Sequence, residues 1–405
     1  MADQNVSRRG ILAATGCAAA TLLSGCNHEG SEPGLQLGSS ELSDAQDNKP
    51  EPTFAEKKLS EMTMEQKVAQ LFIVTPESLT GVSVATAAGD MTRAALETYP
   101  VGGLCYFGRN ITGNQQLRDM LANTREMGCV AGAGIAPFLT IDEEGGPLVA
   151  RVANSGYFDV EHFSNMADIG ASGDVTHAAY VGSSIGSYLH EIGFNVDFAP
   201  DADVLTNPYN TVIGPRSFGS DPQLVADMVA AEVDAMLDAG VLPCIKHFPG
   251  HGDTAGDSHT GAVYAERSRA DIEACEFLPF ISGIEAGCPL VMVGHIETPN
   301  FAADGLPASL SKTMMTDVLR DQLGFGGVIV SDSFAMGAIT ENYTPADAAV
   351  RYFQAGGDML LMPENLEEAY NGVLSAVQLG DISSERLDES LARILALKEQ
   401  VGLLA

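Results

Sequence analysis

The sequence predicts a parallel (β/α)8 barrel, or TIM barrel, formed by a single α/β domain. From about residue 54 onward, short runs that are apolar almost throughout alternate with helix-like segments. Strands buried on both faces, as in a parallel barrel, have this composition. The eight predicted strands cover residues 70–75, 103–107, 137–142, 195–200, 241–246, 289–294, 327–331 and 358–362. A doubly wound open sheet is the alternative, but no G-x-G-x-x-G motif follows the first strand.

Three of the intervening segments are predicted as helices with defined ends. One follows Asp174, a suitable N-cap, and repeats apolar residues at helical spacing as far as Ile192. Another opens with Asp221 and Pro222 and ends at Gly240. The last predicted helix covers residues 384–400. One domain is sufficient to hold all of these elements.

Composition narrows the possible partners. The chain has 405 residues, of which 45% are hydrophobic, and a formal net charge of −33. This acidic balance excludes nucleic acid as a partner, because phosphates require lysine and arginine. It indicates solubility or salt tolerance and does not identify a substrate. We expect a monomer that needs no cofactor. The cysteines beyond the leader show no zinc or disulfide spacing, so we expect neither a zinc site nor a disulfide framework; they are Cys105, Cys129, Cys244, Cys275 and Cys288.

The N-terminal residues resemble export signals. Residues 7–12 (SRRGIL) form a twin-arginine start, and an apolar run over 12–23 follows it. Residues 23–26 (LSGC) resemble the lipobox of bacterial lipoproteins, with Cys26 as the lipidated residue; a chance cysteine behind an ordinary signal peptide is the alternative. We therefore expect a signal peptide over 1–26, a flexible polar tether over 27–53, and the catalytic domain over 54–405. The protein is then exported and held at the outer face of the bacterial cell membrane only by its lipid, or secreted if it is not lipidated.

Polar side chains recur where the predicted strands end. In a parallel barrel these ends meet at one face, which is the catalytic face of such enzymes. A single carboxylate in such a position can be structural, but a recurrence at five strand ends favours a site. The residues concerned are Asp142, Asp201, Asp203, Lys246, His247, His295, Glu297 and Asp332.

The densest polar segment is residues 246–259 (KHFPGHGDTAGDSH), which holds three of the eight histidines. His247 and His251 are four residues apart, as in a metal-binding helix. Pro249 and Gly250 would break that helix, and no glutamate base accompanies it, so we expect no metal and a structural role for His251. Two other interpretations of this segment stay open. It is either a solvated loop or a loop that binds sugar and transfers protons.

Three motifs now identify a family. Residues 246–254 with the Asp257-Ser258-His259 sequence behind them resemble the signature of glycoside hydrolase family 3 β-N-acetylhexosaminidases. Residues 213–219 (IGPRSFG) and 330–333 (VSDS) are similar to two further signatures of that family. The resemblance extends from about Met62 to the end of the chain.

The resemblance implies roles for three residues in catalysis. Asp332 matches the nucleophile, which forms a covalent glycosyl-enzyme intermediate in a retaining glycosidase. His259, paired with Asp257, matches the family's general acid/base dyad. Histidine suits this role because it titrates near neutrality, and an adjacent aspartate can fix its tautomer and stabilise the imidazolium.

The resemblance also implies a set of sugar-binding residues. Asp142, Arg216, Lys246 and His247 match the family's binding positions, where they can accept from or donate to sugar hydroxyls and the acetamido group. Arg151 matches a further arginine, but it stands one residue later than the family's usual spacing. Pro147 occupies a position where the family often has arginine.

We therefore expect a retaining exo-β-N-acetylhexosaminidase that removes terminal N-acetylglucosamine from peptidoglycan fragments or related glycans. A phosphorylase of the same family, with phosphate as the acceptor, is the first alternative, since nothing in the sequence distinguishes water from phosphate. A non-catalytic, lipid-anchored glycan-binding protein is the second, but the complete set of catalytic residues argues against it. Family 3 glucosidases and xylosidases lack the Asp-Ser-His loop and are disfavoured.

Overall fold

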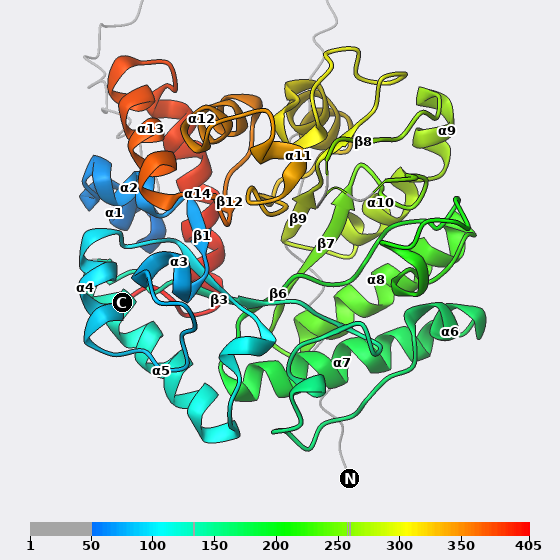
Figure 1. Cartoon of the computed structure of the whole chain (residues 1–405), viewed down its shortest axis with the longest axis horizontal. Coiled ribbons are helices and arrows are strands. Elements are labelled where there is room, and N and C mark those ends of the chain that lie inside the picture. The colour runs from blue at the N-terminus through cyan, green and yellow to red at the C-terminus, as the bar shows by residue number, and fades with distance from the viewer. Residues whose placement is uncertain (1–50, 133, 257, 259–260) are drawn as a thin grey trace, which may run out of the picture. The chain divides into compact units, whose positions relative to one another are not determined.

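The eight predicted strands form one parallel sheet that closes on itself. The computed structural model describes residues 51–132, 134–256, 258 and 261–405 (Figure 1). The sheet order is β11 (Val328–Ser331), β9 (Leu290–Val293), β7 (Leu242–Phe248), β6 (Val196–Asp197), β3 (Phe138–Ile141), β2 (Gly103–Tyr106), β1 (Phe72–Val74) and β12 (Leu360–Leu361). A parallel bridge between Val330 and Met359 joins the two outer strands. The predicted (β/α)8 barrel is therefore confirmed, and the open-sheet alternative was wrong.

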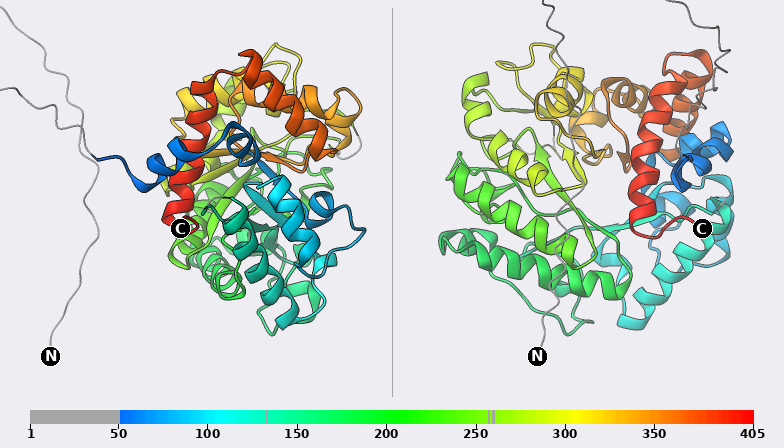
Figure 2. Two further views of the ribbon diagram at one scale, coloured as in Figure 1. Left: turned by 90° about the vertical axis from the view of Figure 1, so that its left-hand side faces the viewer. Right: turned by 180° about the vertical axis from the view of Figure 1, so that it is seen from behind.

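Helices surround the strands on the outside of the barrel (Figures 1 and 2). They are α1 (Phe54–Glu61), α2 (Met64–Ala69), α3 (Pro76–Thr80), α4 (Asp90–Thr98), α5 (Asn114–Ala131), α6 (Met166–Ala171), α7 (Val175–Ile192), α8 (Pro222–Asp238), α9 (Arg269–Ala274), α10 (Phe277–Glu285), α11 (Gly337–Thr340), α12 (Pro345–Ala355), α13 (Leu366–Leu379) and α14 (Ser384–Gln400). A π-helical segment covers Thr313–Gln322. Two small accessory pairs, β4 (Glu143–Gly145) with β5 (Val149–Ala150) and β8 (Val263–Tyr264) with β10 (Ile296–Glu297), lie outside the barrel sheet.

The helix ends follow the capping residues that the sequence contains. Asp174 accepts a hydrogen bond from the Thr176 amide at the start of α7. Asp221 caps α8 in the same way, and Gly240, with φ of +88°, follows the end of that helix. These side chains satisfy amide groups that the first helical turn leaves without a backbone partner. The predicted last helix coincides with α14.

The apolar side chains of the barrel strands fill the core. Every residue of β1, β2, β3, β7, β9 and β11 is buried. Helix α8 turns Val225, Met228, Val229 and Met236 towards this core, each of them fully buried. Burial on both faces of the sheet explains why alternation of polar and apolar residues is absent from the strands.

Residues 51–405 form one compact unit. The predicted signal peptide, its lipidation residue Cys26 and the tether up to residue 50 lie outside the described residues. Among the residues that the structure describes, no helix combines the length and apolar character needed to cross a membrane. The five cysteines beyond the leader are free thiols, and all but Cys129 are buried.

Candidate active site

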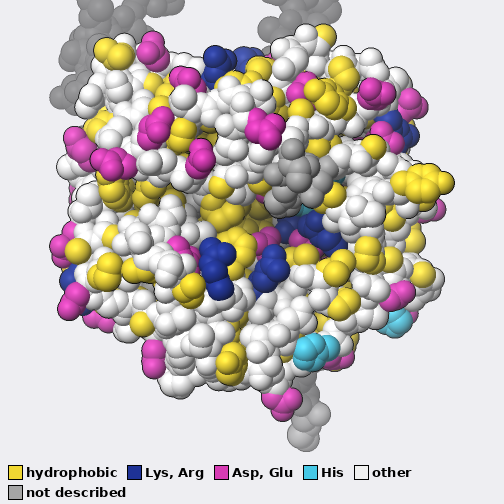
Figure 3. Space-filling view, in the orientation of Figure 1, with side chains coloured by type: hydrophobic (Ala, Val, Ile, Leu, Met, Phe, Trp, Pro, Cys, Tyr) yellow, Lys and Arg dark blue, Asp and Glu magenta, His cyan; other side chains and the backbone are white. Residues whose placement is uncertain are grey.

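A cavity of about 230 Å³ opens at the carboxyl ends of the barrel strands. Figure 3 shows this face of the molecule, with lysine and arginine side chains gathered around a central hollow. All of the predicted site residues that the structure describes line the cavity: Asp142, Arg151, Arg216, Lys246, His247 and Asp332. Asp257 and His259 lie outside the described residues, whereas Ser258 between them is buried and lines the cavity.

The barrel topology brings these residues together. Asp142 directly follows β3 and Asp332 directly follows β11, so both stand where their strands end. Lys246 and His247, which were expected at the end of the fifth strand, instead lie inside β7, because that strand continues to Phe248. Successive residues of a regular strand point to opposite faces, yet both side chains line the cavity. The pairing of β7 with β9 shifts register between Ile245 and Phe248, so the strand is irregular where Lys246 and His247 lie.

Two cations on the cavity wall share one buried carboxylate, Glu144. The Arg216 guanidinium donates to its two oxygens over 2.8 and 2.7 Å, and Lys246 Nζ lies 2.5 Å from Oε1. Lys246 also donates to Asp142 over 2.8 Å. Burial alone would raise the pKa of Glu144, but the charges of Arg216 and then Lys246 hold it well below its usual range. Both cations therefore remain charged and fixed in direction. Glu144 was not predicted as a site residue, although its position beside Asp142 at a strand end was a usable signal.

A second buried pair fixes His247. Its Nδ1 lies 2.7 Å from Asp203 Oδ2, and Asp203 Oδ1 accepts the His251 backbone amide over 2.5 Å. Burial lowers the pKa of His247, but the charge of Asp203 outweighs burial and holds it above its ordinary value. In turn, burial opposes ionisation of Asp203, yet the His247 charge lowers the pKa of that carboxyl to about 2. Asp203 follows the fourth strand. Its pairing with His247 was not predicted from the sequence and is evident only in the folded structure.

Asp332 is the cavity carboxylate that can take part in the reaction. Burial would raise its pKa, but the nearby charges of His247 and His295, together with a 2.7 Å hydrogen bond from the Ser333 amide, hold the pKa below its ordinary value. The carboxylate is therefore ionised at neutral pH. An ionised carboxylate among fixed hydrogen-bond donors in a small cavity can act as a nucleophile or stabilise a developing positive charge.

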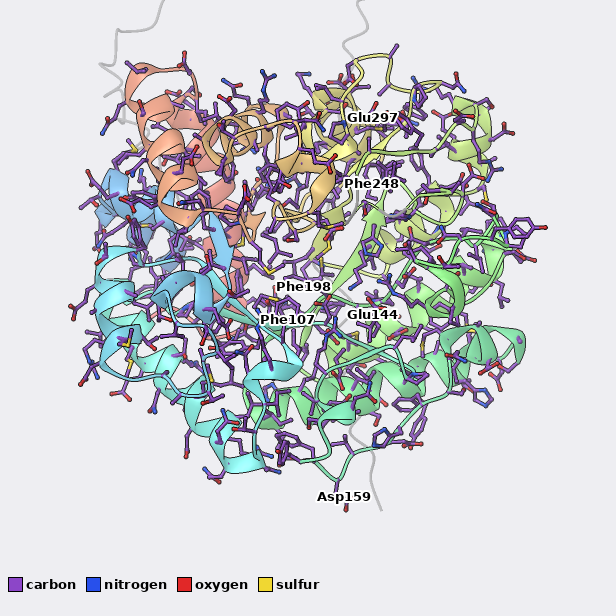
Figure 4. All side chains as sticks on the ribbon, viewed as in Figure 1. Phe107, Glu144, Asp159, Phe198, Phe248 and Glu297 are labelled. Atoms are coloured by element: carbon purple, nitrogen blue, oxygen red, sulfur yellow. The ribbon has the colours of Figure 1, made fainter. Side chains whose placement is uncertain are left out.

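Two of the predicted strand-end residues, His295 and Glu297, do not line the cavity. His295 is buried; its Nδ1 lies 2.7 Å from Ser309 Oγ and its Nε2 lies 2.8 Å from the Ser333 carbonyl. Glu297 belongs to β10 and, in Figure 4, lies away from the centre where Phe107 and Glu144 are found. His251 lines the cavity, and both of its ring nitrogens have partners, Thr254 at 2.7 Å and Ser258 at 3.3 Å, which hold the ring in place.

Ligand atoms of Asp201, Asp203 and His247 lie within 4.8 Å of one another, a spacing that could hold a metal ion. The electrostatics oppose this. Arg216 Nη2 lies 3.6 Å from Asp201 Oδ2, and burial together with the charge of Asp203 raises the pKa of Asp201 to about 8. A protonated carboxyl beside a guanidinium is a poor cation ligand. The donor set therefore fits an ion-pair network better than a metal centre.

Comparison with known proteins places this geometry in a family. Residues 63–397 match the family described as "Glycosyl hydrolase family 3 N terminal domain". "Beta-hexosaminidase LpqI" of Mycobacterium tuberculosis is 31% identical over 400 residues, which cover 94% of this chain and 95% of that protein. "Beta-hexosaminidase A" of Pseudoalteromonas piscicida is 34% identical over 330 residues, and this match spans only 54% of its length.

Solved structures give the same result. A glycoside hydrolase family 3 beta-N-acetylglucosaminidase from Paenibacillus has a TM-score of 0.77 at 35% identity, covering 84% of this chain and 63% of that one. A family 3 glycosyl hydrolase from Mycobacterium smegmatis has a TM-score of 0.73 at 31% identity, covering 84% and 98%. The chain that carries this barrel and this cavity belongs to glycosyl hydrolase family 3.

Proposed function

We propose that this protein is a retaining exo-β-N-acetylhexosaminidase that hydrolyses terminal β-linked N-acetylglucosamine. The observation that carries the proposal is the Asp332 carboxylate on the wall of a cavity that Lys246 and Arg216 also line, each of them paired with the buried Glu144. Relatives named beta-hexosaminidase and beta-N-acetylglucosaminidase support the choice of sugar.

In the proposed mechanism Asp332 attacks the anomeric carbon and forms a covalent glycosyl-enzyme intermediate. His247 and His295 hold the carboxylate in its ionised, nucleophilic form. The His259 and Asp257 dyad, outside the described residues, protonates the leaving oxygen and then activates water. A second displacement at the same carbon restores the β configuration.

The sugar is held by the fixed polar groups of the cavity. Lys246 and Arg216 remain charged because Glu144 lies against both, and each can direct further N–H groups at a hydroxyl or the acetamido oxygen. Asp142 shares Lys246 with Glu144 and can accept from a sugar hydroxyl. Groups that are already oriented bind without a further cost in side-chain entropy, which favours the transition state.

The natural substrate in this proposal is a peptidoglycan fragment or related glycan outside the cytoplasm. The twin-arginine and lipobox patterns support export and lipidation at Cys26. Mass spectrometry of the mature N-terminus tests this step. A diacylglyceryl group on Cys26 supports the anchor, whereas an intact N-terminus on membrane-free protein contradicts it.

Hydrolysis of 4-nitrophenyl N-acetyl-β-glucosaminide tests the activity, and proton NMR of the first sugar released tests the stereochemistry. The proposal expects the β anomer to form first. Initial release of the α anomer would refute the retaining mechanism. Repeating the reaction with inorganic phosphate separates hydrolysis from phosphorolysis, because only a phosphorylase yields sugar 1-phosphate. Lack of turnover in both conditions would favour a glycan-binding protein.

A further inference from the structure

Arg216 lies between two buried carboxyl groups that it does not contact equally. Its Nη2 donates to Glu144 Oε1 over 2.7 Å but lies 3.6 Å from Asp201 Oδ2. Its Nε donates to the second Glu144 oxygen over 2.8 Å, and its Nη1 donates to the Val212 carbonyl over 3.1 Å. A guanidinium has five N–H groups, so these bonds leave one on Nη1 and one on Nη2 without a partner in the described part of the chain. Both are available to a ligand in the cavity that Arg216 lines.

Asp201 is buried, and one of its oxygens has no hydrogen-bond partner. Oδ1 accepts the Asp203 amide over 2.9 Å, whereas Oδ2 makes no hydrogen bond among the described residues. An ionised carboxylate that is buried without a direct donor costs far more free energy than a neutral carboxyl in the same place. The separation of 3.6 Å between Oδ2 and the Arg216 guanidinium therefore indicates that Asp201 carries a proton.

The charges around Asp201 favour the protonated form. The charged and titratable groups that face it come from β4, β7, α8 and the loops beyond β6, and they are Glu144, Lys246, His247, Glu232, Asp203 and Arg216. Each of the three cations is already paired with another buried carboxylate. Glu232 adds a buried carboxyl whose two oxygens have no hydrogen-bond partner among the described residues. Burial, followed by the charge of Asp203, raises the pKa of Asp201 to about 8.

We propose that Asp201 is a positioning residue for Arg216: as a neutral carboxyl it leaves the guanidinium free to bind the sugar, and as a carboxylate it binds the guanidinium itself. This inference rests on the proposed function, in which Arg216 donates to the sugar. An ionised Asp201 accepts the remaining N–H group of Nη2 in a charge-assisted hydrogen bond, which turns that group away from the ligand. Because the carboxyl holds its proton at neutral pH and loses it as the pH rises through about 8, sugar binding weakens on the alkaline side.

The experiment follows sugar binding against pH, measured as the Ki of N-acetylglucosamine in the chromogenic assay. Ki reports binding without the chemical steps, so it is separate from the titration of the general acid, which acts on kcat. In wild type, Ki should rise roughly tenfold from about pH 7 to about pH 9, because only the fraction with a neutral Asp201 binds the sugar. Asp201→Asn has the shape of the neutral carboxyl and cannot ionise, so its Ki should stay within about twofold over the same range.

Asp197→Asn is the matched control. Asp197 is equally buried, its Oδ2 has no partner among the described residues, and burial raises its pKa, but its Oδ1 accepts the Glu143 amide and it makes no ion pair with Arg216. This variant should keep the wild-type rise in Ki. Calorimetry on wild type gives a second test that needs no substitution. Binding of N-acetylglucosamine near pH 8 should take up about half a proton, since about half of the Asp201 carboxyls are ionised there and only the neutral form binds.

The outcomes separate the inference from the function on which it rests. If wild type does not hydrolyse the chromogenic substrate at neutral pH, the proposed function fails. If it does, but its Ki is the same at neutral and alkaline pH or Asp201→Asn keeps the wild-type rise, Asp201 does not control Arg216. If Asp201→Asn already binds the sugar at neutral pH as weakly as wild type does at alkaline pH, Asp201 is an ionised partner of Arg216 and the proposal is overturned. Should Asp201→Asn fail to fold, the proton uptake of wild type decides, and its absence refutes the proposal.

Discussion

The Glu144→Gln substitution tests how the cavity is held together. Glutamine has the same shape but no charge, so the bidentate bond to Arg216 and the 2.5 Å contact with Lys246 lose their ionic partner. Lys246 then keeps Asp142, at 2.8 Å, while the nearest remaining carboxylate oxygen to Arg216 is that of Asp201, at 3.6 Å. The Arg216 guanidinium, with a side chain only 14% exposed, is therefore left in a buried site with a weaker partner.

The expected magnitude follows from that geometry. Removing one partner of a buried ion pair costs about 3–5 kcal/mol, since the other charge remains buried. At ~2 °C per kcal/mol for a domain of this size, the Tm falls by roughly 6–10 °C. Turnover suffers as well, because the two sugar-binding cations are no longer fixed. We expect kcat/KM for the chromogenic substrate to fall at least about tenfold, equivalent to ~1.4 kcal/mol.

The measurements are a thermal melt and steady-state kinetics on the same preparation. Glu191→Gln is the control, since it removes a glutamate that pairs with Arg118 at 2.9 Å but is 75% exposed. A surface ion pair of that kind contributes about 0–1 kcal/mol, so the control should melt within ~2 °C of wild type. The ion-pair argument would be refuted if Glu144→Gln matched wild type in both Tm and kcat/KM.

Three further predictions concern the nucleophile, its neighbours and a buried lysine. Asp332→Ala is expected to abolish turnover, and His259→Ala to slow it severely while sparing substrates with good leaving groups; near wild-type rates for Asp332→Ala in the chromogenic assay would contradict the nucleophile assignment. His247→Gln removes a positive charge that lowers the pKa of Asp332, so the acid limb of the pH profile of kcat/KM should move to higher pH, and an unmoved limb would argue against that coupling. Lys398 is fully buried, and burial holds its pKa well below the ordinary value of 10.5. Between its folded and unfolded pKa values the unfolded chain binds the extra proton, so stability should rise with pH in that window, and urea titrations should show a smaller rise in Lys398→Met.

Much of the barrel could be predicted because local sequence specifies it directly. Strands buried on both faces must be apolar throughout, and all eight predicted strands are present. Helix starts depend on a single capping side chain, so Asp174 and Asp221 marked α7 and α8 without tertiary information. The end of the fifth strand was placed too early because Lys246 and His247 are polar, and polarity normally ends a buried strand. The cavity supplies the ion pairs that make them tolerable inside β7.

Partnerships in the site could not be predicted in the same way. The sequence placed Asp142, Lys246 and His247 at one face of the barrel, and Arg216 matched a family motif, but it did not show which side chains pair. One carboxylate, Glu144, contacts both Lys246 and Arg216. This arrangement requires three distant segments of the chain to come together. Hydrogen bonds between such distant residues leave no periodic trace in the sequence.

The sequence by itself determined the strand and helix order, the closure into a barrel, and the side chains that stand at one face, because these depend on burial and on short-range capping. Only the tertiary structure decided which charges neutralise one another. It paired Lys246 and Arg216 with Glu144 and His247 with Asp203, and it left the Arg151 Nε without a partner among the described residues. Electrostatic energies depend on distances of a few ångströms and on exclusion of water, and both arise only when the strand ends converge.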